Sequence, residues 1–254
     1  MNNGGSGEGE EQRGYGDFAE AYDALTFNVP YDEIAEYYNE ILCSLTKGKR
    51  LLDMGCGTGN LSVRMTALGF DVIGQDASEE MLTIAAAKST DIRWICQNMS
   101  ETELGEPADA VISTLDSINH LQDADEMEKC FRAVSRNLKS GGVFAFDVNT
   151  IYKHREILGS NTFIYDVDGI YCVWQNEFDP ADNGVGIELD LFFEEEDGVY
   201  TRGYESFREV AVSENELRRR LERAGFQIVD IWEYLTHGIP NERSEKLMVI
   251  ARKP

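Results

Sequence analysis

Residues 51–60 read LLDMGCGTGN, and this stretch decides the fold. An apolar segment runs into three glycines that alternate with other residues, and a helical pattern follows. A glycine-rich turn between a first strand and a helix lets the backbone approach a ligand closely. Dinucleotide-binding turns space their glycines as G-x-G-x-x-G, which presents amides to a pyrophosphate. Counted from Gly55, the sixth position is Asn60, so the dinucleotide pattern is not met.

An acidic residue, Asp53, stands two positions before the first glycine. A carboxylate there would repel a diphosphate and attract a cation. S-adenosylmethionine carries a sulfonium and an α-ammonium and has no phosphate. We therefore expect Asp53 to organise the turn and attract the ammonium, while Gly55 and Gly57 leave room for the methionine part. An NAD-dependent oxidoreductase is the alternative, and the mismatch at Asn60 argues against it.

The sequence on both sides of this turn alternates short apolar runs with amphipathic ones. This order is typical of parallel βαβ units and predicts a doubly wound α/β sheet. Ser78, followed by Glu79 and Glu80, has the pattern of a helix N-cap. The predicted strands are 50–54, 70–74, 92–96, 108–115 and 143–148, and the predicted helices are 31–45, 60–68, 78–88 and 123–138, the last capped by Gly141-Gly142.

The pattern changes after residue 150. Four segments alternate apolar and polar residues between turns that contain Gly and Asp, which predicts an antiparallel meander. A helix over 213–224 follows, with Ser213 and Glu216 placed for a capping box. The predicted meander strands are 163–167, 170–178, 186–194 and 199–210, and two further strands are predicted over 226–235 and 245–252.

These patterns divide the chain into three parts. Residues 1–13 are rich in Gly, Asn, Ser and Glu, and we expect a disordered tail there. Residues 14–150 and 211–254 form the expected cofactor-binding core, and residues 151–210 form an inserted β subdomain. Because the insertion directly follows the fifth strand, we expect it to lie over the cofactor cleft as an acceptor-facing lid. Its alternative role is a dimer contact.

Two further polar positions follow the second and third strands. Asp76 ends the second strand, where an acidic group can accept hydrogen bonds from two ribose hydroxyls, although it could instead only start the next helix. Asn98 follows the third strand, where it could bind the adenine amine. Met81 and Met99 could pack on the adenine ring, although methionines at such positions are usually core residues.

The motifs of residues 50–149 resemble those of class I SAM-dependent methyltransferases. They are LLDMGCGTGNLS, VIGQDASEEML, QNM and LKSGGVFAFDV, in the order and spacing of that family. The segments YGDFAEAYDALTFNVPYDE, TLDSINHL and IPNERSEKLMVIARK further resemble a bacterial subgroup of small methyltransferases. The resemblance implies a seven-stranded Rossmann-like sheet whose last strand is antiparallel.

The same resemblance implies how S-adenosylmethionine is held. It places Asp53, Gly55 and Gly57 at the methionine end, Asp76 on the ribose and Asn98-Met99 on adenine. Tyr22 would close over the cofactor, and Leu115 and Asp116 would flank it. Many relatives carry Asp where this chain has Asn98, whose amide oxygen can still accept a hydrogen bond from the adenine amine. The expected cofactor-binding residues are Tyr22, Asp53, Gly55, Cys56, Gly57, Asp76, Ala77, Met81, Asn98, Met99 and Leu115.

Methyl transfer is an in-line displacement, and it needs a general base only when the acceptor is protonated. Asp116 and His120 are the candidates, because they follow the fourth strand, where open α/β sheets bind ligands. A lone histidine such as His120 is also often structural, and His154 and His237 are weaker candidates. Aromatic residues that could form a pocket wall, or belong to an ordinary core, are Tyr15, Phe18, Tyr152, Tyr171 and Trp174.

Charge and composition limit the partners. The formal net charge is −24, which disfavours nucleic acid and anionic membranes, because binding to nucleic acid depends on Lys and Arg that neutralise phosphates. The cysteines are odd in number and show no zinc spacing, so we expect reduced core thiols, no metal and a cytoplasmic location. The cysteines are Cys43, Cys56, Cys96, Cys130 and Cys172.

The sequence therefore predicts a cytoplasmic, SAM-dependent methyltransferase that acts on an N or O nucleophile of a small-molecule acceptor, as a monomer or homodimer. Two alternatives stay open. One is a SAM-binding module without transferase activity, which would bind the cofactor and never yield S-adenosylhomocysteine. The other is a methyltransferase that acts on a protein or peptide.

Overall fold

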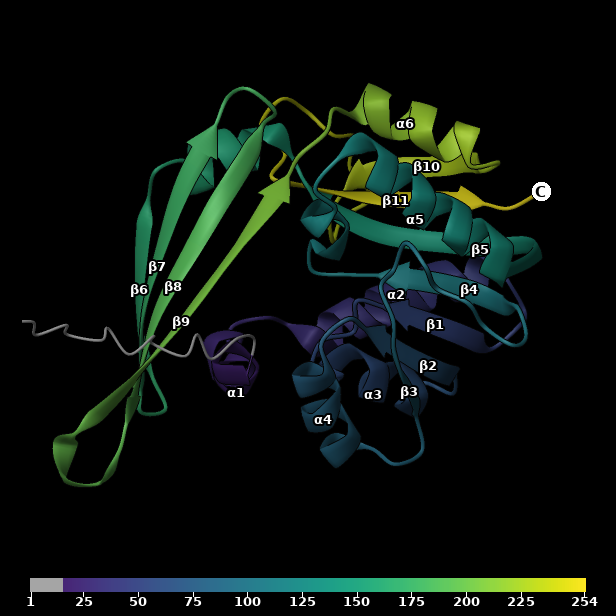
Figure 1. The fold of residues 1–254 in the computed structure, drawn as a ribbon. Coiled ribbons are helices and arrows are strands. Elements are labelled where there is room, and N and C mark those ends of the chain that lie inside the picture. Colours follow the sequence, from purple (N-terminus) through teal and green to yellow (C-terminus); the bar gives the residue numbers. More distant parts are fainter. Residues whose placement is uncertain (1–15) are drawn as a thin grey trace, which may run out of the picture.

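A computed structural model describes residues 16–254, so the expected tail and Tyr15 lie outside the described residues. Its centre is a seven-stranded sheet in the order β10-β11-β5-β4-β1-β2-β3 (Figure 1). In this order each strand from β5 through β4, β1 and β2 to β3 is parallel to the next. Strand β11 is antiparallel to both β5 and β10. The predicted doubly wound α/β fold is thus confirmed. The strands are β1 (Arg50–Met54), β2 (Asp71–Asp76), β3 (Arg93–Cys96), β4 (Ala108–Ser113), β5 (Leu138–Asn149), β10 (Gln227–Glu233) and β11 (Lys246–Arg252).

Helices cover both faces of this sheet. Within residues 16–254 no helix is both long and apolar enough to cross a bilayer. The predicted caps form: the hydroxyl of Ser78 accepts from Met81 N, and that of Ser213 accepts from Glu216 N. The helices are α1 (Gly16–Leu25), α2 (Tyr31–Leu45), α3 (Asn60–Ala67), α4 (Glu79–Lys88), α5 (Ala124–Asn137) and α6 (Glu214–Arg223), with short helical turns η1 (Ser117–His120), η2 (Lys153–Leu158) and η3 (Glu196–Gly198).

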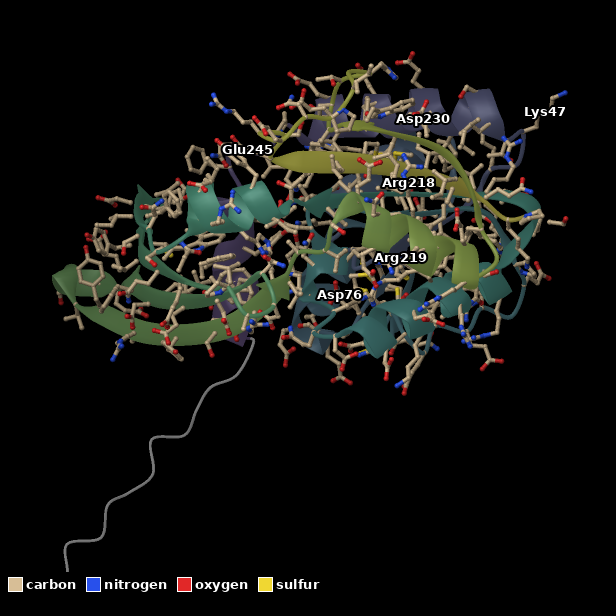
Figure 2. The ribbon with its side chains drawn as sticks, turned by 90° about the horizontal axis from the view of Figure 1, so that it is seen from above. Lys47, Asp76, Arg218, Arg219, Asp230 and Glu245 are labelled. Atoms are coloured by element: carbon tan, nitrogen blue, oxygen red, sulfur yellow. The ribbon has the colours of Figure 1, made fainter. Side chains whose placement is uncertain are left out.

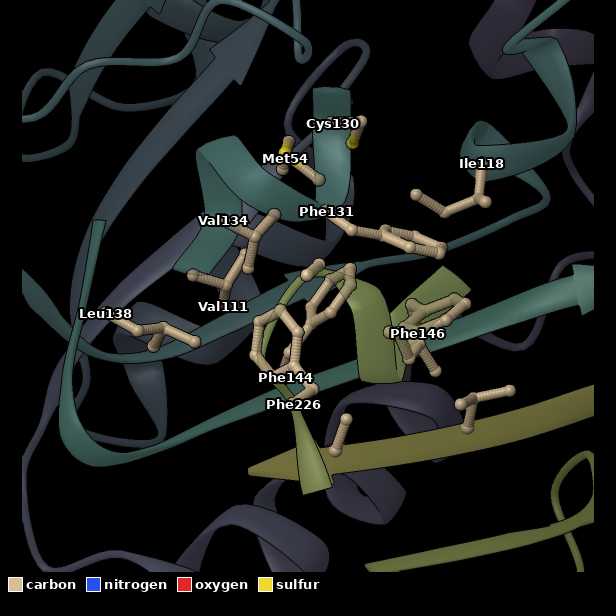
Figure 3. Packing of buried hydrophobic residues seen from close by; sticks show 14 of the residues in the cluster. Met54, Val111, Ile118, Cys130, Phe131, Val134, Leu138, Phe144, Phe146 and Phe226 are labelled. Atoms are coloured by element: carbon tan, nitrogen blue, oxygen red, sulfur yellow. The ribbon is translucent and has the colours of Figure 1, made fainter. Parts of the chain in front are cut away.

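Alternate residues of the strands serve two separate cores. Leu52 and Phe144 face α5 and α6, whereas Leu51 and Ala145 face α2 and α3. Figure 3 shows the first of these cores, where the rings of Phe144 and Phe146 stack with centroids 4.4 Å apart. Because both faces are buried, the central strands read as continuous apolar runs, and this is why the sequence revealed them.

The junction between α5 and β5 differs from the prediction. The helix ends at Asn137, one residue early, and β5 begins at once with Leu138, which pairs with Ala108. Gly141-Gly142 does not cap the helix. These glycines lie inside the strand span and exchange backbone hydrogen bonds with Lys253, with Gly141 at φ 79°. Glycine accommodates this bend because it tolerates positive φ.

The predicted meander forms a second sheet, in the order β6-β7-β8-β9. Its buried face packs on α1, mainly through Ala21 and Leu25. Seen from above, this sheet extends from one end of the core (Figure 2). Its strands are β6 (Thr162–Val167), β7 (Ile170–Asp179), β8 (Gly184–Glu194) and β9 (Tyr200–Val210).

All five cysteines are free, but they are not all core residues. Cys130 and Cys172 are buried as expected. Cys43, on α2, and Cys96, at the end of edge strand β3, are exposed, so the expectation of core thiols is wrong for these two. The sequence spacing gave no means of separating the two groups.

Candidate active site

A cavity of about 440 Å³ opens at the carboxyl ends of β1, β2 and β4. Parallel α/β sheets bind ligands at this edge, where the strand order reverses. The cavity brings together ten of the expected site residues, all of them from residues 22–120. They are Tyr22, Gly55, Gly57, Asp76, Ala77, Met81, Asn98, Met99, Leu115 and His120.

The glycine-rich turn forms the floor of this cavity. Gly55, Gly57 and Gly59 all have positive φ, at 75°, 53° and 77°. A Cβ on Gly55 would lie 2.7 Å from the hydroxyl of Ser117, so this position excludes any side chain. A Cβ on Gly57 would lie 3.9 Å from the Tyr22 ring, so this ring lies close to the turn.

Asp53 lies beneath the turn and does not line the cavity. Its side chain is fully buried, and its Oδ2 accepts a hydrogen bond of 2.5 Å from the Ser62 hydroxyl. Its Oδ1 has no partner among the described residues. Burial raises the pKa of Asp53 to about 7; the Ser62 hydrogen bond opposes this shift, and the nearby Asp76 charge adds to it. A positively charged ligand above the turn would favour the ionised form.

Asp76 lines the cavity and also holds the turn. Its Oδ2 accepts from Gly57 N at 2.8 Å, and its Oδ1 accepts from Ser78 N at 3.0 Å. The carboxylate therefore starts the next helix and fixes the glycine turn, while keeping lone pairs for a ligand. Ala77 and Met81 line the same wall.

Asn98 is held in an unexpected orientation. Its Oδ1 accepts from both the backbone N and the Oγ of Ser100, each at 2.8 Å. The amide oxygen, which was expected to bind the adenine amine, is thus already engaged. The amide nitrogen is left as the group that can bind a ligand as a donor. The neighbouring Met99 lines the cavity as expected.

Leu115 and Asp116 form a strained turn after β4. Both have positive φ, at 53° and 60°, which is costly for residues other than glycine. Their backbone amides donate to the two oxygens of Asp147, at 2.8 and 2.9 Å. Lys246 lies 2.9 Å from the fully buried Asp147 and neutralises its charge. Sequence reasoning missed this pair, because the two residues are far apart in the chain and belong to no local motif.

Asp116 does not line the cavity. Its Oδ2 accepts from Asn149 Nδ2 at 2.6 Å and lies 3.8 Å from Lys246 Nζ. Burial alone would raise the pKa of this carboxyl, but the charges of Lys246 and Lys153 outweigh burial and lower it to about 2. A carboxylate with so low a pKa is a poor general base at neutral pH.

His120 and the aromatic residues Phe18, Tyr22 and Phe207 line the same cavity. The His120 ring lies 5.2 Å from the ring of Phe207, which comes from β9 of the antiparallel sheet. The ring centroid of Phe18 lies 5.8 Å from that of Phe207 and 5.5 Å from that of Tyr22. Phe207 had no signal in the sequence, because nothing in an alternating strand shows which residue reaches a distant cavity.

Several other candidates lie elsewhere. Cys56 lines a small space of about 30 Å³ that adjoins the cavity behind Tyr22. His154 is buried against Glu209, and His237 packs on Trp232. Tyr152, Tyr171 and Trp174 are not among the residues that line the cavity.

The charge of the cavity fits a cationic cofactor. The described residues that line it include Asp76, Glu80 and Glu126 and no Lys or Arg. A diphosphate would have no cation to pair with there, whereas a sulfonium with an ammonium would be attracted. The unpartnered Oδ1 of Asp53, beneath the turn, fits the same cationic ligand.

Comparison with known proteins agrees with this geometry. Residues 51–142 match the methyltransferase domain family. A protein of Geobacillus sp. (strain WCH70), whose name describes an inferred methyltransferase, is 34% identical over 94% of this chain and 99% of its own length. The crystal structure of an S-adenosylmethionine-dependent methyltransferase from Clostridium acetobutylicum ATCC 824 superposes with a TM-score of 0.84, at 30% identity, over 94% of this chain and 98% of that one.

This chain belongs to the SAM-dependent methyltransferases. S-adenosylmethionine is accordingly the methyl donor, and the alternative of an NAD-dependent oxidoreductase is set aside. Over about half of its length the methyltransferase is also 30% identical to a dTDP-3-amino-3,4,6-trideoxy-alpha-D-glucopyranose N,N-dimethyltransferase of Streptomyces venezuelae, of which the match covers 55%.

Proposed function

We propose that this methyltransferase transfers the methyl group to a nitrogen or oxygen of a small molecule, with an amine as the favoured nucleophile. The observation that carries this proposal is the position of Phe207. It reaches from the inserted sheet into the cavity that Asp76 and Gly57 also line. An acceptor held between the two sheets would be shielded from water, which a displacement at a sulfonium carbon requires.

Two arguments favour an amine. The relative from Streptomyces venezuelae is named for dimethylation of an amino sugar. In addition, acidic residues and the aromatic rings of Phe18, Tyr22 and Phe207 surround the cavity, and such surroundings attract a cationic or neutral amine. The negative net charge of −24 argues against nucleic acid as acceptor.

The residues divide the work as follows. We assign Gly55, Gly57 and Asp76 to the methionine and ribose parts of the cofactor, which supplies an activated methyl group. In the reaction the carbon–sulfur bond breaks as the bond to the acceptor forms, and the acceptor loses one proton. We assign His120 to take that proton, because it lines the cavity, whereas the low pKa of Asp116 suits a structural charge.

The inserted sheet, residues 151–210, serves in this proposal as the acceptor lid. His154, at its start, and Glu209, at its end, meet with their nitrogen and oxygen 3.2 Å apart. Asn149 of the core donates to the same Glu209 oxygen at 2.9 Å. These buried contacts tie the two ends of the inserted segment to each other and to the core. A role in dimerisation is compatible with the same attachment, and we propose a cytoplasmic enzyme that is a monomer or homodimer.

The test is turnover with a panel of amino sugars, simple amines and hydroxyl compounds, followed by the release of S-adenosylhomocysteine. We expect turnover with at least one amine, and we expect Phe207→Ala to raise the acceptor KM by about tenfold, as loss of a buried aromatic contact would. Phe192→Ala is the matched control, because Phe192 packs on Tyr171 on the other side of the sheet. Methyl transfer to protein alone, or equal effects of the two variants, would contradict the proposal.

A further inference from the structure

Helix α1 lies between the antiparallel sheet and the core (Figure 1). Its residues Phe18 and Tyr22 both line the cavity. Its apolar residues Ala21 and Leu25 pack on the antiparallel sheet. The Tyr22 ring lies against the glycine turn, since a Cβ on Gly57 would be 3.9 Å from it, so α1 is placed to cover the part of the site assigned to the cofactor.

One side chain of α1 ties the helix to the core. Asp23 Oδ1 accepts from Thr58 Oγ1 at 2.6 Å and from Asn60 Nδ2 at 2.8 Å. Asp23 Oδ2 lies 2.5 Å from Lys88 Nζ, which also donates to Asn60 Oδ1 at 2.9 Å. We refer to Asp23, Thr58, Asn60 and Lys88 as the Asp23 latch.

The latch joins the three elements that bound the cofactor site. Thr58 belongs to the glycine-rich turn, Asn60 begins α3, and Lys88 ends α4. Asp23 directly follows Tyr22 in the chain, so its contacts fix the height of the Tyr22 ring above Gly57. We propose that Asp23 is a positioning residue, which holds α1 closed over bound S-adenosylmethionine and whose release from Thr58, Asn60 and Lys88 opens the cofactor site.

The composition of the latch suits a contact that opens and closes. The Asp23 side chain is 40% exposed and that of Lys88 26%, so both reach water readily when they separate. The apolar side of α1 stays packed on the antiparallel sheet, which keeps the helix folded. Because the ion pair is partly exposed, salt will weaken the latch and speed the opening.

The test measures how fast bound S-adenosylhomocysteine leaves the full-length protein. Radiolabelled product is bound and then chased with unlabelled product, at low and at physiological salt. We expect Asp23→Ala to speed release by about tenfold, as loss of charged hydrogen bonds would. Asp23→Asn, which keeps an oxygen for Thr58 and Asn60, should give a smaller increase. Glu20→Ala is the matched control: it removes the same charge from an exposed position of α1, and release should stay as in the wild type.

A second measurement separates positioning from general loosening of the fold. In the presence of S-adenosylhomocysteine, amide hydrogen exchange should speed up over residues 17–25 in Asp23→Ala and remain unchanged in β4 and β5. Lys88→Met should also speed the release of S-adenosylhomocysteine. The double variant should release it no faster than Asp23→Ala does, because both substitutions break the same Asp23 latch. If Asp23→Ala does not fold, Lys88→Met alone carries the test through its release rate.

The proposal is overturned if Asp23→Ala and Lys88→Met both release the product at the wild-type rate. It is equally overturned if Glu20→Ala speeds release as much as Asp23→Ala, or if the effects of Asp23→Ala and Lys88→Met multiply independently. A wild-type protein that binds no S-adenosylhomocysteine would instead refute the cofactor assignment, so the two failures are distinguishable.

Discussion

At the scale of single residues, Asp53 is the buried carboxylate beneath the glycine turn of the candidate site. The sequence predicts that it organises the turn, and the structure places it there, fully buried with one oxygen unpartnered among the described residues. A buried carboxylate without a cation is unfavourable, so the group holds its proton to about pH 7. We expect a cationic cofactor above the turn to offset this cost.

The pH dependence of stability tests this view of Asp53. Its pKa is about 7 in the fold and roughly 3.9 in an unfolded chain, so the unfolded form gives up its proton first as the pH rises. The free energy of unfolding should fall between about pH 4 and pH 7, by on the order of 4 kcal/mol at most. Urea unfolding of the ligand-free protein at pH 5 and pH 8 measures it. The free energy of unfolding of Asp53→Asn should not show this fall. An equal fall in the wild type and in Asp53→Asn would contradict the raised pKa of Asp53.

Asp76 gives a second prediction at this scale. Its carboxylate accepts two backbone hydrogen bonds and faces the cavity. We expect Asp76→Ala to weaken binding of S-adenosylhomocysteine by about 1–3 kcal/mol, through the ribose contact and the loosened turn. Calorimetry measures the affinity, with Asp91→Ala as a control that removes an exposed carboxylate. Unchanged affinity in Asp76→Ala would remove this residue from the site.

Asn98 shows what a sequence cannot reveal about one residue. Its position after β3 was predictable from the strand pattern. The orientation of its amide was not, because the orientation depends on the two hydrogen bonds that Ser100 donates to it. Ser100 thus occupies the amide oxygen of Asn98, so Asn98 can offer a ligand a hydrogen-bond donor and not the expected acceptor.

At the scale of elements, the turn between β4 and η1 depends on a residue of another strand. Asp147, in β5, accepts the amides of Leu115 and Asp116 and is neutralised by Lys246 of β11. Asp147→Ala would leave Lys246 buried near a single distant carboxylate and release a strained turn. We expect it to destabilise the protein by about 3–5 kcal/mol, the range for breaking a buried ion pair.

Urea unfolding measures the effect of Asp147→Ala. Asp71→Ala removes an exposed carboxylate from the start of β2 and serves as the control, with an expected change within about 0.5 kcal/mol. If Asp147→Ala lowers the free energy of unfolding no more than Asp71→Ala does, other contacts hold the turn.

Most elements were predictable because local signals agree. Apolar runs, N-caps such as Ser78 and Ser213, and Gly-Asp turns gave the strands and helices of both sheets. Helix α1 was not among the predicted elements: it has only ten residues, and its apolar residues Ala21 and Leu25 pack on the antiparallel sheet and not on the core. The end of α5 was misplaced, because glycines that usually end helices here bend a strand.

At the scale of the whole molecule, the active site is assembled from segments far apart in the chain. Phe18 from α1 and Phe207 from β9 meet above a turn formed by residues 55–59. The resemblance implied a seven-stranded sheet whose last strand is antiparallel, and the insertion point suggested the lid. Neither indicates which side chain of a long strand reaches the cavity, since that depends on how the second sheet tilts against the first.

The most direct test of the cofactor site is a pair of calorimetric titrations of the wild-type protein, with S-adenosylhomocysteine and with NAD. The glycine turn, the buried Asp53 and a lining without Lys or Arg among the described residues predict saturable binding of S-adenosylhomocysteine and no binding of NAD. Binding of NAD, with no response to S-adenosylhomocysteine, would contradict the account.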